Sequence, residues 1–468
     1  MESIIQHIAN TLVKKVLEKA QESGMADIDA LAAELLEDCK EAASGCLEAI
    51  LDSWNQAIRE DKSGRREKGL VMKEKDRRRT LLTKLGEIQY SRDYYYDKQR
   101  KHYTAVLDDA IGVRAYERVG DAVGAELAQA ATGLSYARSA RLVTGGAVSR
   151  QTVRNKILAT QSLEVAPHFQ KRKVRELHIF ADEDHVHMQK PHKARGKQNQ
   201  QVPLVTVTEG IKNVDKRRRR TINPMHFVDE EFNTKRLWEA VGNYIMMAYD
   251  MNHLKKIYVH GDGGSWIKHG LDTFAQAEYV MDGYHFEKSL KQLANRFNGR
   301  SVRYRIHQAL AKNDRKKADA ILQGLLDASE DDKTTEKVKE FATYLLDNWD
   351  SIVRRQDSQM TGSCTESQIS HVLSERFSRD PLGWSKPGLG KLSKLRIYVA
   401  NGGRITNKDL RDMEAPHYSD FTEKLLNEAI AHTVDWSIVE EREPMILDPA
   451  SGTQTLLRSL GRTRNPLC

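Results

Sequence analysis

The spacing of apolar residues divides the first part of the chain into segments of different kinds. Over residues 1–60, apolar residues such as Ile8 and Leu12 recur at helical spacing, which predicts a helical N-terminal arm. We interpret this arm as an interaction or oligomerisation element, the alternative being a plain helical cap. Residues 61–118 begin as a polar, basic linker up to position 79 and then alternate at period two, which predicts a small β-meander.

Residues 119–165 return to helical spacing and predict a helix-turn-helix DNA-binding module. A glycine turn ends the second helix, and Ser149 has the position of an N-cap for the third. In that arrangement Arg150, Gln151 and Arg154 project toward base edges in a major groove, where Arg reads guanine and Gln reads adenine. A three-helix unit that binds no DNA is the alternative.

The pattern over residues 170–283 predicts the first part of an α/β catalytic core of ribonuclease H-like type. Three strands, a helix, a strand, a short helix and a last strand follow one another, and the first strand covers 175–187. This order gives a mixed five-stranded sheet with flanking helices. In such a sheet the first and fourth strands lie side by side.

Three consecutive acids lie in the first strand, where burying their charges would cost free energy. Asp182, Glu183 and Asp184 follow an apolar run that ends at Ala181. Buried carboxylates cost several kcal/mol each unless they are neutralised, and a divalent metal is the usual neutraliser. The sequence therefore predicts a metal site, with Asp262 of the fourth strand brought beside Asp182. The alternative is that the strand ends near Ala181 and the acids lie in a solvated turn.

A third acid comes from the segments downstream. Residues 284–361 have amphipathic helical spacing and are predicted to form an inserted helical subdomain. Residues 362–400 then hold the last core helix, with Glu366 in its first turn. Ser363 and Glu366 also fit a capping box, so helix capping is the alternative role of Glu366. Residues 401–468 are predicted to form a C-terminal helical region and tail.

The charge balance indicates the kind of partner. The chain has 74 Lys and Arg against 66 Asp and Glu, a net charge of +8 and a pI near 9.0. The excess gathers in runs, one of which contains Arg217 and Arg218, and such runs favour a polyanionic partner, of which double-stranded DNA is one. The four cysteines form no close pairs, which argues against a disulfide framework or a cysteine zinc site. No apolar run approaches bilayer length, so we expect a cytoplasmic protein without a membrane partner.

Several short motifs stand out between roughly residues 70 and 400. They are F-A-D-E-D-H-V-H at 180–187, G-D-G-x-x-W-I at 261–267, Asp282-Gly-Tyr-His285 with Lys288, C-T-E-x-x-I-S-H-V-L at 364–373, and Gly383-Trp384-Ser385. Together they resemble the ISLre-type insertion-sequence transposases, which are similar to the Mutator-like DDE transposases.

The resemblance implies that Asp182, Asp262 and Glu366 are catalytic metal ligands. Asp184 lies on the same strand face as Asp182, so which of the two is the first ligand stays open. The motif residues without an assigned catalytic role are Asp282, His285, Lys288 and Trp384. The expected cofactor is Mg²⁺, with Mn²⁺ as a substitute, because paired divalent ions activate a water or a 3′-hydroxyl and stabilise the leaving oxygen.

The expected function is to bind transposon end repeats, hydrolyse a DNA strand there and join the freed 3′-hydroxyl to target DNA. Cutting two ends implies a homo-oligomer, at least a dimer on DNA. The resemblance implies that the protein is located in the bacterial cytosol and lies at the nucleoid when it is bound to DNA. Two alternatives are a domesticated DNA-binding regulator that has lost catalysis and a structure-specific nuclease of the same fold.

Overall fold

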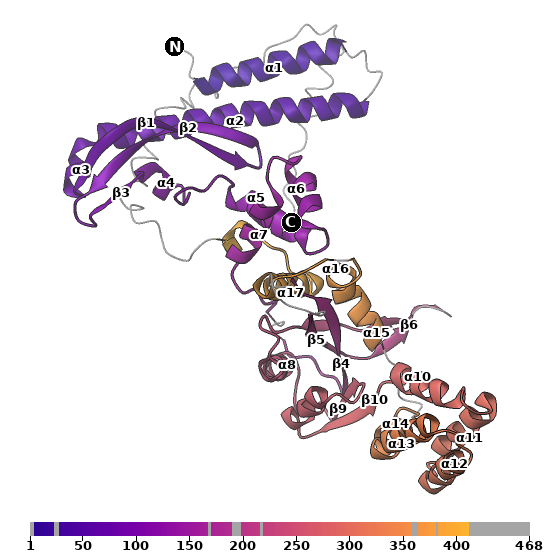
Figure 1. Ribbon diagram of the computed structural model, residues 1–468. Coiled ribbons are helices and arrows are strands. Elements are labelled where there is room, and N and C mark those ends of the chain that lie inside the picture. The colour runs from indigo at the N-terminus through magenta and orange to yellow at the C-terminus, as the bar shows by residue number, and fades with distance from the viewer. Residues whose placement is uncertain are drawn as a thin grey trace. The chain divides into compact units, whose positions relative to one another are not determined.

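A computed structural model describes residues 4–22, 28–166, 170–189, 198–215, 219–356, 364–380 and 382–410 (Figure 1). Contacts divide the chain into two compact units, with the division after Val123. The first unit carries the N-terminal helices and a small sheet, and the second carries the helix-turn-helix, the mixed sheet and the inserted helices. No helix within the described ranges is both long and apolar enough to cross a lipid bilayer.

The first unit packs a long helix on a three-stranded sheet. α1 (Ile4–Glu22) and α2 (Ile28–Glu60) lie where helices are predicted, and Leu51 and Ile58 of α2 are buried in a core that includes Ile88 of the sheet. The strands and the short helices beside them are β1 (Leu70–Thr83), β2 (Gly86–Asp97), β3 (His102–Thr104), α3 (Lys62–Glu67) and α4 (Val106–Ala110).

The basic linker predicted up to position 79 is wrong, because those residues form α3 and most of β1. β1 pairs antiparallel with β2 from Leu70↔Asp97 to Thr83↔Gly86, with register shifts around Glu74. Residues 73–78 are all exposed. Hydrogen bonds to β2 hold this part of the strand without burial, so it carries none of the apolar alternation by which a strand is predicted.

Three helices occupy the predicted helix-turn-helix: α5 (Asp121–Ala131), α6 (Tyr136–Thr144) and α7 (Arg150–Ala159). Ser149 caps α7 as predicted, and its hydroxyl oxygen accepts a hydrogen bond of 3.2 Å from the Thr152 amide. α6 ends at Gly145 with φ 62°, a left-handed conformation that glycine adopts at little cost.

The mixed five-stranded sheet is confirmed, with the strand order β10-β9-β4-β5-β8. The first and fourth strands of the prediction, β4 and β9, are parallel neighbours, whereas β4 and β5 pair antiparallel. β4 is continuous through the three acids, so the solvated-turn alternative is wrong. The strands are β4 (Glu176–His187), β5 (Asn199–Thr208), β8 (Met225–Phe227), β9 (Lys256–Gly261) and β10 (Ala277–Met281), and a separate pair is β6 (Ile211–Asn213) with β7 (Arg219–Thr221).

Helices cover both faces of this sheet. Leu177, Ile179 and Ala181 share one buried core with α8 (Thr234–Ala248). The segment that carries Glu366 also contacts β4. After β9 and before β10 come α9 (Ser265–Lys268) and a 3₁₀ turn, η1 (His269–Thr273).

The inserted helical subdomain is present downstream of β10 (Figure 1). Its helices are α10 (Gly283–Ala294), α11 (Gly299–Ala311), α12 (Arg315–Asp327), α13 (Asp332–Asp347) and α14 (Trp349–Arg354). The last described elements are α15 (Thr365–Gln368), a π-helical segment η2 (Ile369–Ser374), α16 (Glu375–Phe377), α17 (Lys386–Ala400) and a 3₁₀ turn η3 (Asn407–Leu410). Of the predicted C-terminal helical region and tail, 401–468, the structure describes residues 401–410, which contain the 3₁₀ turn η3. The rest of that prediction lies outside the described residues.

Candidate metal centre

The pairing of β4 with β9 brings two of the predicted acids to one place. Phe180 pairs with His260 at the last described step of the parallel register. Two residues further on, Asp182 and Asp262 therefore occupy corresponding positions, and they are close enough for the Asp262 charge to perturb the pKa of Asp182. Gly261 permits the close packing of α9 on the end of β9, because a Cβ atom there would lie 2.8 Å from the Ile267 side chain.

Each of these carboxylates accepts a hydrogen bond from a backbone amide one or two residues further along the chain. The Glu183 amide donates to Oδ1 of Asp182 at 2.9 Å, and the Gly264 amide donates to Oδ1 of Asp262 at 3.0 Å. Gly263, with φ +104°, makes the turn after β9 that allows the second of these bonds. Both side chains are thereby oriented before any ligand binds.

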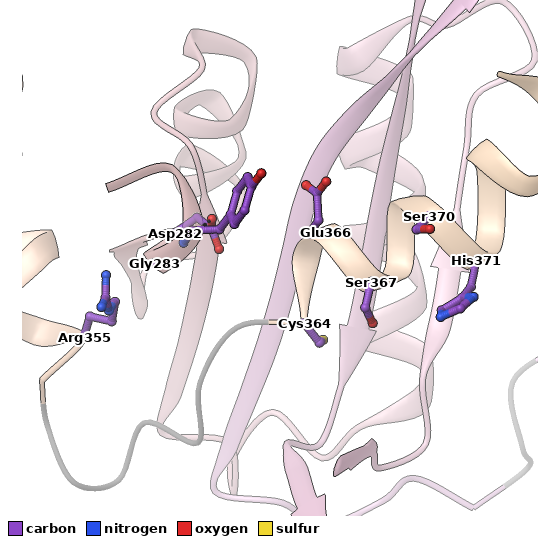
Figure 2. Close-up of a pocket in the computed structure, with 9 residues that line it drawn as sticks. Asp282, Gly283, Arg355, Cys364, Glu366, Ser367, Ser370 and His371 are labelled. Atoms are coloured by element: carbon purple, nitrogen blue, oxygen red, sulfur yellow. Dashed lines mark hydrogen bonds between the residues drawn. The ribbon is translucent and has the colours of Figure 1, made fainter. Parts of the chain in front are cut away.

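Glu366 joins Asp182 from a distant part of the chain. Ligand atoms of Asp182, His285 and Glu366 all lie within 4.8 Å of one another. Glu366 is exposed, and its side chain leaves the helix on the side opposite to those of Ser367 and His371 (Figure 2). Asp262 is not part of this close group, although it neighbours Asp182.

The structure gives little support to a capping role for Glu366. Ser363, the other residue of the capping box, lies outside the described residues. α15 begins at Thr365 with Cys364 as its N-cap, which makes Glu366 the second helical residue. A capping box requires Glu at the third helical position, so the described geometry does not match it.

Asp184 has surroundings unlike those of Asp182. It is buried, its Oδ1 accepts a hydrogen bond of 2.9 Å from the Ser378 hydroxyl, and burial raises its pKa. Its ligand atoms are not in the group formed by Asp182, His285 and Glu366. Asp184 thus links β4 to the end of α16.

The predicted Asp282-x-x-His285 motif separates into two roles. Asp282 is buried and caps α10, its carboxylate accepting from the amides of Tyr284 and His285 at 3.0 and 3.2 Å. The His285 side chain, by contrast, lies with Asp182 and Glu366, and we call these three residues the acidic group. The sequence identified His285 only as a motif residue. Its position in the first turn of a helix that follows a core strand was the one feature that could have indicated a place near the acids. Lys288 is exposed, with its Nζ 5.6 Å from the Tyr284 ring centroid.

Trp384 is a packing residue in this structure. Its indole N–H donates to the Phe377 carbonyl at 3.0 Å, and its ring is buried against Tyr136 and Phe377. The Arg376 guanidinium lies 4.8 Å from the Trp384 ring centroid. Trp384 therefore joins α16 to the helix-turn-helix.

The electrostatics of the acidic group favour a bound cation. Burial raises the pKa of Asp182 to about 7, and the Asp262 charge adds to that rise, while His285 opposes it. Carboxylates that are hard to ionise alone are stabilised as anions by a divalent ion. Two carboxylates and an imidazole in one group, with Asp262 beside them, suit Mg²⁺ or Mn²⁺, and the nitrogen is a donor that transition metals accept more readily than Mg²⁺.

A cavity of about 590 Å³ adjoins this centre (Figure 2). Asp282, Tyr284, Arg355, Glu366 and His371 are among its lining residues. The cavity leaves open space beside the Glu366 side chain.

The predicted DNA-reading residues lie on α7. Arg150 and Gln151 are exposed and Arg154 is half-buried; the Gln151 side chain donates to Asn155 Oδ1 at 2.9 Å. Arg217 and Arg218 lie outside the described residues.

Comparisons with known proteins give a family. The model of an uncharacterised protein family, UPF0236, matches residues 21–414. One UPF0236 protein of Caldanaerobacter subterraneus subsp. tengcongensis is 34% identical over 393 residues, covering 83% of this chain and 80% of the relative. Another from the same organism is 34% identical over 429 residues, covering 89% and 87%. A UPF0236 protein in the vanSb 3′ region of Streptococcus gallolyticus is 26% identical over 336 residues, covering 68% and 71%.

Among solved structures, the chain matches the Drosophila P element transposase strand transfer complex with a TM-score of 0.21 and 13% identity, over 66% of this chain and 92% of that chain. The family match covers much more of the chain's organisation, since it spans both compact units and relatives of similar length also match. The chain therefore belongs to the uncharacterised protein family UPF0236.

Proposed function

We propose that this protein is a DDE-type transposase, which binds the ends of its own element, cuts a DNA strand there and joins the freed 3′-hydroxyl to target DNA. The observation that carries the proposal is the convergence of Asp182, Glu366 and His285 within 4.8 Å, with Asp262 at the corresponding position of the neighbouring strand. Acids from a sheet and a later helix meet at one point. The strand order supports a ribonuclease H-like core.

The residues that would hold Mg²⁺ or Mn²⁺ are Asp182, Asp262 and Glu366, with His285 beside them. When bound, the metal would activate a water or a 3′-hydroxyl and stabilise the leaving oxygen of the phosphodiester. Asp282 fixes the first turn of α10 and so positions His285. The hydrogen bond between Asp184 and Ser378 ties the segment that follows Glu366 to β4.

The relatives support a transposase over other nucleases. The name of one Caldanaerobacter relative joins eleven locus designations. We interpret these as copies at separate sites in one genome, which is the distribution that a self-moving element produces. A structure-specific nuclease would use the same acids, and strand joining is the activity that separates the two. Retention of the acidic group argues against an inactive regulator.

The test is cleavage and joining of the DNA that flanks the gene, which we call boundary DNA. Wild-type protein should cut boundary DNA in Mg²⁺. Glu366→Gln should lower the cleavage rate by at least about 10²-fold, since even outer-shell changes at metal sites cost 10–100-fold. The matched control is Glu336→Gln, which changes an exposed helical glutamate of α13. Glu366→Gln that binds and cuts like the wild type would show that the metal site is elsewhere.

A further inference from the structure

A second site lies between the helix-turn-helix and the core, within the second compact unit. A groove of about 570 Å³ has Arg150, Arg154 and Tyr136 of the helix-turn-helix on one side. Gln189 and Trp384 of the core line it as well. We call this the α7 groove. It differs from the cavity beside Glu366 in all of its lining residues.

The charge of the α7 groove selects an anion. Arg150, Arg154 and Arg376 line it, and none of its described lining residues is acidic. Among the residues that the structure describes, neither Arg150 nor Arg154 forms an ion pair with a carboxylate. The other large grooves contain glutamates, such as Glu340 in one and Glu164 in another. Arginines without carboxylate partners in a concave surface fit a phosphate backbone.

The groove has a fixed shape because the helix-turn-helix is bonded to the core. Arg376 donates to the Ala131 carbonyl at 2.9 Å, and Arg396 donates to the Thr132 carbonyl at 2.7 Å. Both carbonyls lie at the C-terminal end of α5, where cationic side chains are favoured. Arg376 also stacks on Trp384. The helix-turn-helix, and α7 with it, is therefore held in place relative to the core.

The strand β4 gives the distance from this groove to the acids. β4 is continuous from Asp182 to His187, Met188 bridges to Trp384, and the Gln189 amide donates to the Trp384 carbonyl at 2.9 Å. At about 3.3 Å per residue, Gln189 lies about 23 Å from Asp182. Double-stranded DNA advances about 3.4 Å per base pair, so this span corresponds to about seven base pairs.

We propose that the α7 groove binds the phosphate backbone of the same DNA that the acidic centre cuts, about seven base pairs from the scissile phosphate. The groove volume equals about 19 water molecules at about 30 Å³ each, which is room for a short stretch of one strand's backbone. Gln151, which is exposed at the same end of α7, then meets the base edges beside that backbone. The inference rests on the proposed function for the cut itself, whereas backbone binding by the groove stands independently.

The first arm of the test measures backbone binding without cleavage. The probe is a random-sequence duplex of about three helical turns, titrated with full-length protein between about 50 and 200 mM salt. The double variant Arg150→Ala/Arg154→Ala should reduce the slope of log K against log salt by about 1.8, because each phosphate contact contributes about 0.9. The control is Arg138→Ala/Arg141→Ala, two exposed arginines of α6 that do not line the groove. An unchanged slope in the Arg150→Ala/Arg154→Ala variant, or an equal loss of slope in both double variants, would refute phosphate binding by the α7 groove.

The second arm locates the contact relative to the cut. Boundary DNA with single neutral methylphosphonates is cut by wild-type protein and by Arg150→Ala/Arg154→Ala, with circular dichroism as the folding control. Slowed cleavage should centre about seven base pairs from the cut in the wild type and disappear in the variant. Interference confined to phosphates next to the cut would refute the spacing. Wild-type protein that binds boundary DNA but does not cut it would refute the proposed function. The salt titration would still show whether the α7 groove binds the phosphate backbone.

Discussion

Asp182 and Asp184 lie on one face of one strand, yet their surroundings differ. The ligand atoms of Asp182 are within 4.8 Å of those of His285 and Glu366, whereas Asp184 is buried and bonded to Ser378. Alternation along a strand predicts that the two acids share a face, but it contains no information on which helix covers each. The choice between them therefore depended on the position of the segment 364–380, which only the tertiary structure supplies.

This difference predicts unequal effects of matched substitutions. Asp182→Asn should lower cleavage of boundary DNA by at least about 10²-fold, because it removes a charge that a divalent ion requires. Asp184→Asn keeps an acceptor for the Ser378 hydroxyl and should retain most of the activity. Single-turnover cleavage measures both, with DNA binding as the folding control. A greater loss in Asp184→Asn would make Asp184 the first metal ligand.

The pKa of Asp182 predicts a pH dependence in metal-free protein. Burial raises it from 3.8 to about 7, so the folded state holds this proton more tightly than the unfolded state does. The contribution of Asp182 to the free energy of unfolding is then greatest below pH 3.8 and is lost as pH rises toward about 7. With a chelator present, the Tm of Asp182→Asn should exceed that of wild type increasingly over this window.

Metal should reverse that loss. At neutral pH, millimolar MgCl₂ should raise the Tm of wild-type protein, because a ligand that binds only the folded state stabilises it. Asp182→Asn should show a smaller rise. An equal rise in both proteins would place metal binding away from Asp182.

At the scale of elements, the edge of the large sheet depends on one side chain. β8 is an edge strand, and Asn401, after α17, replaces a neighbouring strand there: its side chain accepts from the His226 amide at 2.8 Å and donates to the His226 carbonyl at 2.9 Å. Thr206 also lies within hydrogen-bonding distance of the His226 ring. Unpaired edges invite association with other chains, so this cap protects the sheet.

Removal of the cap should therefore destabilise the core. Asn401→Ala leaves both backbone groups of His226 without this partner and should lower the free energy of unfolding by about 1–3 kcal/mol, with more aggregation on heating. Denaturant titration and light scattering measure these effects. The control is Asn252→Ala, an exposed asparagine in a turn. Equal stability of the two variants would show that the edge does not need Asn401.

The elements were predictable where periodicity and caps coincide. The order of strands placed β4 beside β9, and Ser149 marked the start of α7. The pattern predicts the end of β1 from position 80 but not residues 70–79, because residues 73–78 are exposed on both faces and show no alternation. The nearness of His285 to Asp182 and Glu366 was not predicted, because it depends on how α10 and α15 pack, and the position of His285 in a first helical turn does not specify that packing.

In the whole molecule, one compact unit contains both the helix-turn-helix and the acidic centre. The helix-turn-helix is bonded to the core through Arg376 and Arg396, and β4 leads from the α7 groove to the acids. Under the proposed function, this arrangement lets one chain both position DNA and act on it. The helices α1 and α2, which form the predicted interaction or oligomerisation arm, belong to the other unit.

In the proposed function, metal held by Asp182, Asp262 and Glu366 acts on the scissile phosphate. The direct measurement is the rate of cleavage of boundary DNA that carries one non-bridging sulfur at that phosphate, in Mg²⁺ and in Mn²⁺. Sulfur is a soft ligand that Mg²⁺ binds poorly and Mn²⁺ accepts better. The account predicts slow cleavage in Mg²⁺ that recovers in Mn²⁺. The same sulfur effect in both metals would contradict it.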